Sequence, residues 1–234
     1  MNRGPALSER LRILADLVLP GQPMADIGTD HGALPYYCLA RDLVPFAVLS
    51  DVNEGPLART GERMERSDVA PERYSLRLGS GLSVLQPQEV KTAVIAGMGG
   101  ELISRLLEAS PDVAESLQRL VLQPRNRSGI LRGWLWENGW RIVCERLVKE
   151  RGRMCQIFAA ERGSQQPYEY PDIPESGDPL MIEFLDREIV NINIILDNLK
   201  RSSEPKDLKK AEAFQRKLSA LEQRREGLWR NSSF

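Results

Sequence analysis

The chain has 234 residues, a length that favours one or two domains and can bury a core without disulfides or metal ions. Its 32 basic and 33 acidic residues leave a net charge of −1, which excludes a histone-like polycation. The 41% of hydrophobic residues and 28% of charged residues exclude a disordered chain. Twenty-five of the basic residues are arginine, whose planar side chain suits phosphate and stacked bases, so a local RNA-binding surface is compatible with the neutral total.

The composition also predicts the compartment. No apolar run approaches the roughly 20 residues of a membrane helix, and the apolar run 13–19 is too short for a signal peptide and carries Asp16. Cys38, Cys144 and Cys155 form no CxxC motif, and the chain has one histidine, which argues against a zinc site and a disulfide framework. We therefore expect a cytoplasmic protein without a structural metal and without a membrane anchor.

The first predicted element is an amphipathic helix that ends before Gly21. Its apolar residues recur at intervals of three or four: Leu7, Leu11, Leu14, Ala15 and Val18. Short apolar runs then alternate with helical patterns. The predicted strands are Met24–Ile27, Phe46–Leu49, a run around Leu76 and Leu78, Ala93–Ala96 and Leu120–Leu122. The predicted helices are Ala33–Ala40, one opened by Pro56, one following Gly100, and Ile130–Trp136. This alternation predicts an α/β fold with a mainly parallel, doubly wound sheet.

Two further strands follow without a helix between them. They are predicted at Trp140–Val148 and Cys155–Ala160, with a turn at Arg151-Gly152-Arg153. Strands joined so closely pair in antiparallel fashion, so this terminal hairpin is expected to add an antiparallel edge to the sheet.

The composition changes after Arg162. Residues 163–179 contain four prolines and two glycines, typical of a linker, and Arg201–Pro205 interrupts the helical pattern that follows. The residues that keep three- and four-residue spacing on either side of this break are mostly apolar: Ile182, Leu185, Ile189, Ile192, Leu196 and Leu199, and then Leu208, Ala211, Gln215, Leu218 and Leu221. We predict a domain at 1–162, a linker at 163–179 and a helical hairpin at 180–234 that forms a short coiled coil. A dimerisation or stability role for this hairpin and a substrate-binding role both remain open, as does the oligomeric state, monomer or dimer.

The stretch Ala25–Gly32, at the end of the first strand, carries the clearest chemical signal. Gly28 and Gly32 allow a tight turn that presents backbone N–H groups to a polar ligand. Asp51 ends the second strand, 21 residues after Asp30, where a carboxylate commonly accepts both hydroxyls of a ribose. The alternative for Asp51 is a turn or helix-cap aspartate.

The turn favours S-adenosylmethionine over a dinucleotide. A dinucleotide site prefers Gly-x-Gly-x-x-Gly, whereas Asp30 occupies the middle position here and would repel pyrophosphate. S-adenosylmethionine has no phosphate and carries a sulfonium cation. Gly79–Gly81 is expected to hold the adenine, and the glycines of Ala96–Gly100 leave room for a flat ligand. The predicted cofactor-binding residues are Asp26, Gly28, Thr29, His31, Gly32, Asp51, Val52, Gly79, Ser80, Gly81, Ala96, Gly97 and Met98.

The order of these motifs resembles the bacterial tRNA adenine-N1 methyltransferases that modify position 22 in the D-arm region. The landmarks that carry the resemblance are Leu7–Leu11, Ala25–Gly32, Leu34-Pro35, Gly55–Leu57, Arg77–Leu82, Ile95–Gly100 and Leu120–Pro124. The resemblance implies a Rossmann-like class I methyltransferase domain followed by a helical C-terminal domain. Three positions depart from the family pattern: Ser80 replaces an aspartate, Ala33 a tyrosine, and Arg125 stands between Gln-Pro and Asn126.

The methyl-acceptor chemistry suggests further roles. Neutral adenine has a free lone pair at N1, so no strong base is needed, but the product is a cation that a carboxylate would stabilise. Asp30 is the predicted catalytic residue, with a turn aspartate as the alternative, and His31 could orient it. The predicted substrate-binding residues are Arg10, Gln123, Pro124, Arg125 and Asn126.

N1 lies on the pairing edge, so the adenine must be unpaired or flipped, and RNA must be gripped elsewhere. Candidate phosphate contacts are Arg125, Arg127, Arg132, Arg216, Arg224 and Arg225. Two alternatives to a tRNA methyltransferase remain: a methyltransferase for a small molecule or protein, and a non-catalytic nucleotide- or RNA-binding protein.

Overall fold

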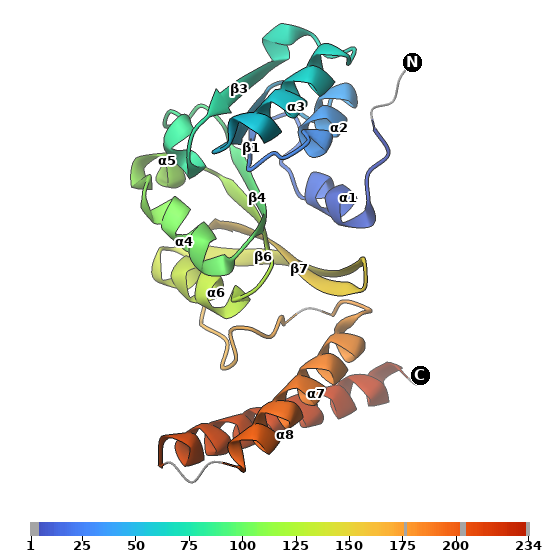
Figure 1. Ribbon diagram of the computed structural model, residues 1–234, viewed down its shortest axis with the longest axis vertical. Coiled ribbons are helices and arrows are strands. Elements are labelled where there is room, and N and C mark those ends of the chain that lie inside the picture. The colour runs from blue at the N-terminus through green and yellow to red at the C-terminus, as the bar shows by residue number, and fades with distance from the viewer. Residues whose placement is uncertain (1–4, 176, 202–204, 233–234) are drawn as a thin grey trace. The chain divides into compact units, whose positions relative to one another are not determined.

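The computed structural model describes residues 5–175, 177–201 and 205–232, and the chain divides after Glu175 into two compact units (Figure 1). This division falls inside the predicted linker 163–179, so the first 13 residues of that segment belong to the first unit. In the described part of the chain, no helix is long and apolar enough to cross a membrane.

The first unit is built on a seven-stranded sheet with the order β3-β2-β1-β4-β5-β7-β6. The strands are β1 (Met24–Ile27), β2 (Ala47–Asp51), β3 (Tyr74–Leu78), β4 (Thr92–Met98), β5 (Arg119–Pro124), β6 (Trp140–Glu150) and β7 (Arg153–Arg162). The helices are α1 (Glu9–Asp16), α2 (Ala33–Ala40), α3 (Glu54–Glu65), α4 (Gly100–Glu108), α5 (Pro111–Ser116) and α6 (Ser128–Glu137), with short 3-10 turns η1 (Pro71–Arg73) and η2 (Gly81–Val84). Strands β1 to β5 are parallel and β7 is antiparallel to both its neighbours, which confirms the predicted Rossmann-like sheet with a terminal hairpin.

The core fills both faces of the sheet because alternate residues of each central strand point to opposite sides. Ile95 of β4 packs with Ile103 of α4 and other residues of α4, α5 and α6, whereas Val94 packs with Leu14 of α1 and residues of α2 and α3. Burying the central strands from both sides leaves their carboxyl ends as the place where loops form a site.

The hairpin β6–β7 is much longer than its contact with the rest of the sheet. Strand β7 pairs with β5 only from Phe158 to Glu161, whereas its pairing with β6 continues to Arg153 opposite Glu150. The half of the hairpin near its turn therefore continues past the carboxyl end of the paired part of β5.

Three details of the predicted elements were wrong. Helix α3 begins at Glu54 rather than at Pro56. Pro56 lies in the first turn, where backbone N–H groups make no intrahelical hydrogen bonds, so the missing N–H of proline costs nothing there. Helix α5 was not predicted, because six residues are too few to show a period. The strand predicted from Phe46 to Leu49 begins one residue later and continues to Asp51.

The second unit contains α7 (Met181–Leu199) and α8 (Pro205–Ser232), which lie side by side. An ion pair of 3.1 Å joins Asp186 near the start of α7 to Arg225 near the end of α8, so the helices run in opposite directions. Leu218 and Leu221 are buried as predicted, but Leu208 is 57% exposed and does not belong to the packed stripe. Most of the predicted break at 201–205 lies outside the described residues. Coiled-coil packing of this hairpin stays a prediction.

Candidate active site

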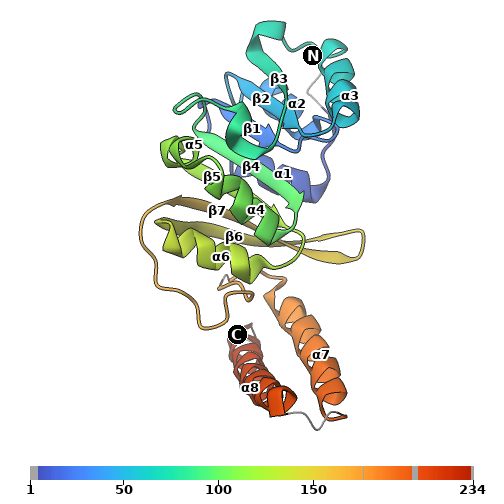
Figure 2. The same ribbon diagram turned by 60° about the vertical axis from the view of Figure 1, so that its left-hand side comes forward.

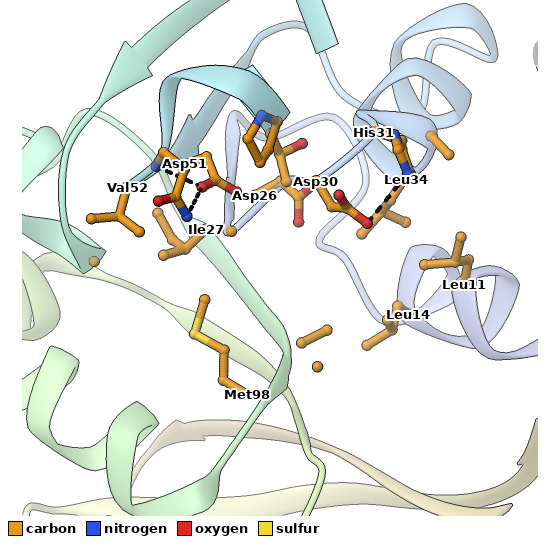
Figure 3. A pocket seen from close by; sticks show the side chains of 18 of the residues that line it. Leu11, Leu14, Asp26, Ile27, Asp30, His31, Leu34, Asp51, Val52 and Met98 are labelled. Carbon is orange, nitrogen blue, oxygen red and sulfur yellow. Dashed lines mark hydrogen bonds and ion pairs between the residues drawn. The ribbon is translucent and has the colours of Figure 1, made fainter. Parts of the chain in front are cut away.

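A pocket of about 830 Å³ opens at the carboxyl edge of the sheet (Figure 3). Its walls come from the carboxyl ends of β1, β2 and β4, from the loops after β1, β2 and β3, from α1 and α4, and from the turn of the β6–β7 hairpin. Small-molecule sites commonly have roughly 300–1,000 Å³. The pocket therefore has the size and the place in the fold expected of a nucleotide-type site.

The loop between β1 and α2 needs glycine for close contact as well as for its backbone angles. Gly28 has φ +78°, and a Cβ atom added there would lie 2.4 Å from Cε of Met98. The N–H groups of Gly28 and Thr29 both donate to the Ser50 carbonyl at 2.9 Å, which ties the loop to the end of β2. Asp30 also adopts a left-handed conformation, with φ +51°, which is costly for a residue with a side chain.

Asp51 is buried at the end of β2, with one carboxylate oxygen already engaged. Its Oδ1 accepts from the backbone N–H of Asn53 at 2.8 Å and from the side-chain amide of Asn53 at 3.4 Å (Figure 3). Its Oδ2 takes part in no hydrogen bond found among the described residues. This oxygen is available for the hydroxyls of a ligand.

Asp26 lies in a less polar environment at the end of β1. Burial raises the pKa of Asp26 to about 6, while the Thr29 side chain and the positive charge of Arg10 act in the opposite direction and the charge of Asp51 adds to the increase. A cationic ligand group beside Asp26 would favour its ionised form.

Asp30 differs from the other two carboxylates because its side chain is 67% exposed. Its oxygens lie 3.6 Å from Nε2 of His31 and 3.7 Å from Nη2 of Arg59, and its backbone carbonyl accepts from the Thr60 hydroxyl at 3.2 Å. The helix α3 therefore helps to place Asp30 at the pocket, and its carboxylate remains accessible to a large substrate.

Two glycine loops form other walls of the pocket. A Cβ atom on Gly79 would lie 2.5 Å from Val84, and one on Gly81 would lie 2.8 Å from Leu106. The Gly79 N–H donates to the Asp51 carbonyl at 3.0 Å, which joins the loop after β3 to the end of β2. Met98, the last residue of β4, comes from the glycine-rich Ala96–Gly100 stretch and lines the pocket as predicted.

The structure places every predicted cofactor-binding residue except Gly32 in the pocket lining. Gly32 lies behind it, where an added Cβ would be 2.7 Å from Thr60. Of the predicted substrate-binding residues, only Arg10 lines the pocket. Pro124 is buried outside it, and Arg125 and Asn126 are exposed outside it.

Gln123 is buried, and its amide is held by the protein itself. Its Oε1 accepts from Nη1 of Arg10 at 3.2 Å, and its Nε2 donates to the Pro124 carbonyl at 3.1 Å. In this arrangement Gln123 holds Arg10 in place, and Arg10 is the member of this pair that reaches the pocket.

Sequence reasoning missed one wall of the pocket. Ser8, Leu11 and Leu14 come from the start of the chain, and Glu150 and Arg151 come from the hairpin turn. Nε of Arg10 donates to Oε2 of Glu150 at 2.5 Å, although the two residues are 140 positions apart. No local pattern in the sequence signals a contact of this separation.

The prediction that Arg132 contacts phosphate is wrong. Its side chain is fully buried, pairs with Glu145 at 2.7 Å, and lies 4.7 Å from the centre of the Phe158 ring. Among the other candidates, Arg127 is exposed but pairs with Glu101.

Comparison with known proteins supports a methyltransferase site. A family model described as "Methyltransferase domain" matches residues 7–158. The tRNA (adenine(22)-N(1))-methyltransferase of Bacillus subtilis (strain 168) is 34% identical over 182 residues, covering 78% of this chain and 76% of that protein. The solved B. subtilis M1A22 tRNA methyltransferase TrmK superposes with a TM-score of 0.84 at 25% identity, over 93% of this chain and 98% of that one. Streptococcus pneumoniae Sp1610, solved in complex with S-adenosyl-L-methionine, gives a TM-score of 0.82 at 27% identity, over 93% and 99% of the two chains.

Proposed function

The chain belongs to the family of tRNA (adenine(22)-N(1))-methyltransferases, and from this we infer that it transfers a methyl group from S-adenosylmethionine to N1 of an adenine in tRNA. The observation that carries this function is the pocket itself, where Asp51, Asp26 and Asp30 meet the glycine loops at the carboxyl edge of the sheet. The target we propose is adenine 22, the position named for the B. subtilis relative.

The residues present fit the cofactor. Asp51 would accept the ribose hydroxyls through its available oxygen, and the loop Gly79–Gly81 would hold the adenine. Asp26 and Arg10 lie where they can receive the charged amino-acid end, and the missing side chain of Gly28 leaves room for the Met98 side chain in the pocket wall.

The protein's main chemical task is to stabilise charge. Bound S-adenosylmethionine supplies a methyl group on a sulfonium; N1 of the adenine forms the new bond with its lone pair, and the electrons of the broken carbon–sulfur bond stay on sulfur. Positive charge therefore passes to the adenine ring. Asp30 places a carboxylate at the pocket, where it stabilises this charge and can accept from the N6 amino group. No residue has to remove a proton before the transfer.

The substrate sets two further requirements. N1 is hidden in a base pair, so the target adenine must leave its stack, and this costs a few kcal/mol that contacts elsewhere must offset. The partner is tRNA, and we place the protein in the cytoplasm, where tRNA is modified.

Labelled S-adenosylmethionine and unmodified tRNA, followed by nucleoside analysis, test this function. We expect 1-methyladenosine in the tRNA, and none in a matched transcript that carries guanine at position 22. Label in a small molecule or a protein would support the other methyltransferase class. A chain that binds S-adenosylmethionine and tRNA without transfer would support the non-catalytic one.

A further inference from the structure

The β6–β7 hairpin extends beyond the sheet on the side of the pocket. Its pairing with β5 ends at Phe158, and β7 residues 153–157 continue past that point, a length of roughly 16 Å at 3.3 Å per residue. Figure 2 shows the turn of this hairpin projecting beyond its neighbours. A structural edge strand would not need this extension to complete the sheet.

The projecting end is strongly basic. We call residues 146–154 the hairpin tip; it contains four basic residues and one acidic residue. The basic residues are all exposed: Arg146, Lys149, Arg151 and Arg153. The acidic residue is Glu150, whose carboxylate is paired with Arg10, a residue outside the tip. The exposed charge of the tip is therefore positive.

The hairpin tip also forms part of the pocket. Glu150 and Arg151 line it beside Arg10. The Arg10–Glu150 pair joins the tip to α1, and the contact of Arg10 with Gln123 joins both to the end of β5. The basic tip is therefore held beside the pocket, close to the phosphates that flank a nucleotide whose base enters the pocket.

The turn of the tip supplies an independent observation. Arg151 has φ +49° and Gly152 has φ +77°, a two-residue turn for which Asn-Gly is the favoured sequence. Arginine is a poor choice for a left-handed conformation, because its Cβ atom then lies too close to the following carbonyl oxygen. A role of its positive charge in binding an anionic partner explains why arginine stands at this position.

We propose that the hairpin tip binds the phosphate backbone of tRNA next to the target adenosine, and that Arg10, through Glu150, fixes the tip at the mouth of the pocket. This inference rests on the proposed function and adds an RNA-contacting surface to it. Exposed arginines on a projecting hairpin can reach phosphates on either side of a flipped base, and such contacts help to offset the cost of flipping.

Two variants of the full chain test the tip. Arg151→Asn with Arg153→Gln removes two charges while giving the turn its favoured Asn-Gly sequence. Arg146→Gln with Arg153→Gln removes two charges without touching a residue that lines the pocket. The matched control is Arg63→Gln with Arg66→Gln, at the end of α3, because that helix starts at the pocket edge and ends at the opposite edge of the sheet.

The measurement is the dissociation constant for unmodified tRNA at several salt concentrations, together with the affinity for S-adenosylmethionine. We expect each tip variant to bind tRNA several-fold more weakly and the slope of log K against log salt to fall by about 1–2, since each lost phosphate contact lowers it by roughly 0.7–0.9. The control should keep the wild-type slope. The Arg146/Arg153 variant should also keep its cofactor affinity, which shows that it is folded.

The inference would be overturned if both tip variants kept the tRNA affinity and the salt slope of the wild type. The proposed function would then still stand, provided that the wild-type chain methylates tRNA. An equal loss in the control would also overturn it, because the effect would then come from net charge alone. A wild-type chain that neither binds nor methylates tRNA would overturn both.

Discussion

Asp26, Asp30 and Asp51 line one pocket in three different environments. Asp51 is buried and bonded to Asn53, Asp26 is buried with a raised pKa, and Asp30 is largely exposed beside His31. A carboxylate with a fixed hydrogen bond suits recognition of neutral hydroxyls, a desolvated one suits a cationic group, and an exposed one can meet a large substrate. These environments favour the separate roles proposed for the three carboxylates.

Replacing Asp51 with alanine should weaken the binding of S-adenosylmethionine. The ribose hydroxyls would lose their acceptor inside a pocket, which costs about 1–3 kcal/mol. Titration calorimetry measures the change, and Asp51→Asn separates the carboxylate's charge from its shape. Unchanged affinity in the alanine variant would remove Asp51 from the cofactor site.

Asp30→Asn should lower turnover with little effect on cofactor affinity. Asparagine keeps the size and the left-handed backbone of the residue but removes the charge that we propose stabilises the methylated adenine, so kcat should fall by about 10²-fold. Single-turnover kinetics with saturating tRNA measures the change. Normal turnover would identify Asp30 as a turn residue only.

Asp26 should make the stability of the chain depend on pH. Burial raises its pKa from 3.8 to about 6, so the folded state holds a proton that the unfolded state has lost between about pH 4 and pH 6. Stability contributed by the protonated form is therefore lost as the pH rises through this window. By this linkage Asp26 makes the free energy of unfolding roughly 1.5 kcal/mol lower at pH 8 than at pH 5.

Urea unfolding without cofactor tests this dependence. Asp26→Asn cannot ionise, so its free energy of unfolding should increase relative to wild type by that amount between the two pH values. A pH-independent difference would show that the pKa of Asp26 is the same in the folded and unfolded chain.

At the scale of single elements, the sequence predicts the strands, helices and turns that are determined by residues close together in the chain. Strand β1 and helix α2 have the predicted bounds, because apolar runs and glycine turns are local signals. The glycine loops that line the pocket follow from the same signals. The Arg10–Glu150 pair and the register of β7 on β5 depend on residues far apart in the chain, for which one sequence carries no pattern.

Arg132 shows the same limit from inside the core. A charged residue in an amphipathic helix predicts an exposed side chain, but Glu145 and Gln156 on the adjoining hairpin accept its hydrogen bonds, and Phe158 covers its face. Arg132 also donates to the Pro171 carbonyl at 3.0 Å. It therefore fastens the segment after β7 to helix α6.

Arg132→Met should destabilise the first unit by about 3–5 kcal/mol, because Glu145 would keep its charge in a buried position without a partner. The double change Arg132→Met with Glu145→Gln should recover part of this loss, since no charge is then stranded. Urea unfolding compares the two. A single variant no less stable than the double variant would contradict this account of the pair.

At the scale of the whole molecule, the boundary after Glu175 decides where the chain can be shortened. The Asp172 carbonyl accepts from Gln156 at 3.2 Å, and the Glu175 N–H donates to Glu145 at 2.8 Å. A chain cut after Arg162 would lose these contacts and expose Arg132. A chain ending at Glu175 keeps them.

The chain that ends at Glu175 should still bind S-adenosylmethionine but should lose tRNA affinity and part of its salt dependence. The pocket lies wholly before Glu175, whereas Arg216, Arg224 and other basic residues of α8 would be removed. Measuring tRNA binding at several salt concentrations, together with light scattering, distinguishes an RNA-binding role of the α7–α8 hairpin from a dimerisation role. A change of molecular mass with an unaltered salt slope would identify it as a dimerisation element.

The pairing of Arg10 with Glu150 has a consequence for how the protein is made. During synthesis the start of α1 leaves the ribosome first, and the strand that covers the open edge of β5 emerges after β6. Until then the nascent chain has an unpaired edge strand and lacks one wall of its pocket. A ribosome stalled before residue 150 therefore holds a chain with the glycine loops but without the complete pocket, so we expect full cofactor affinity only after the β6–β7 hairpin has formed.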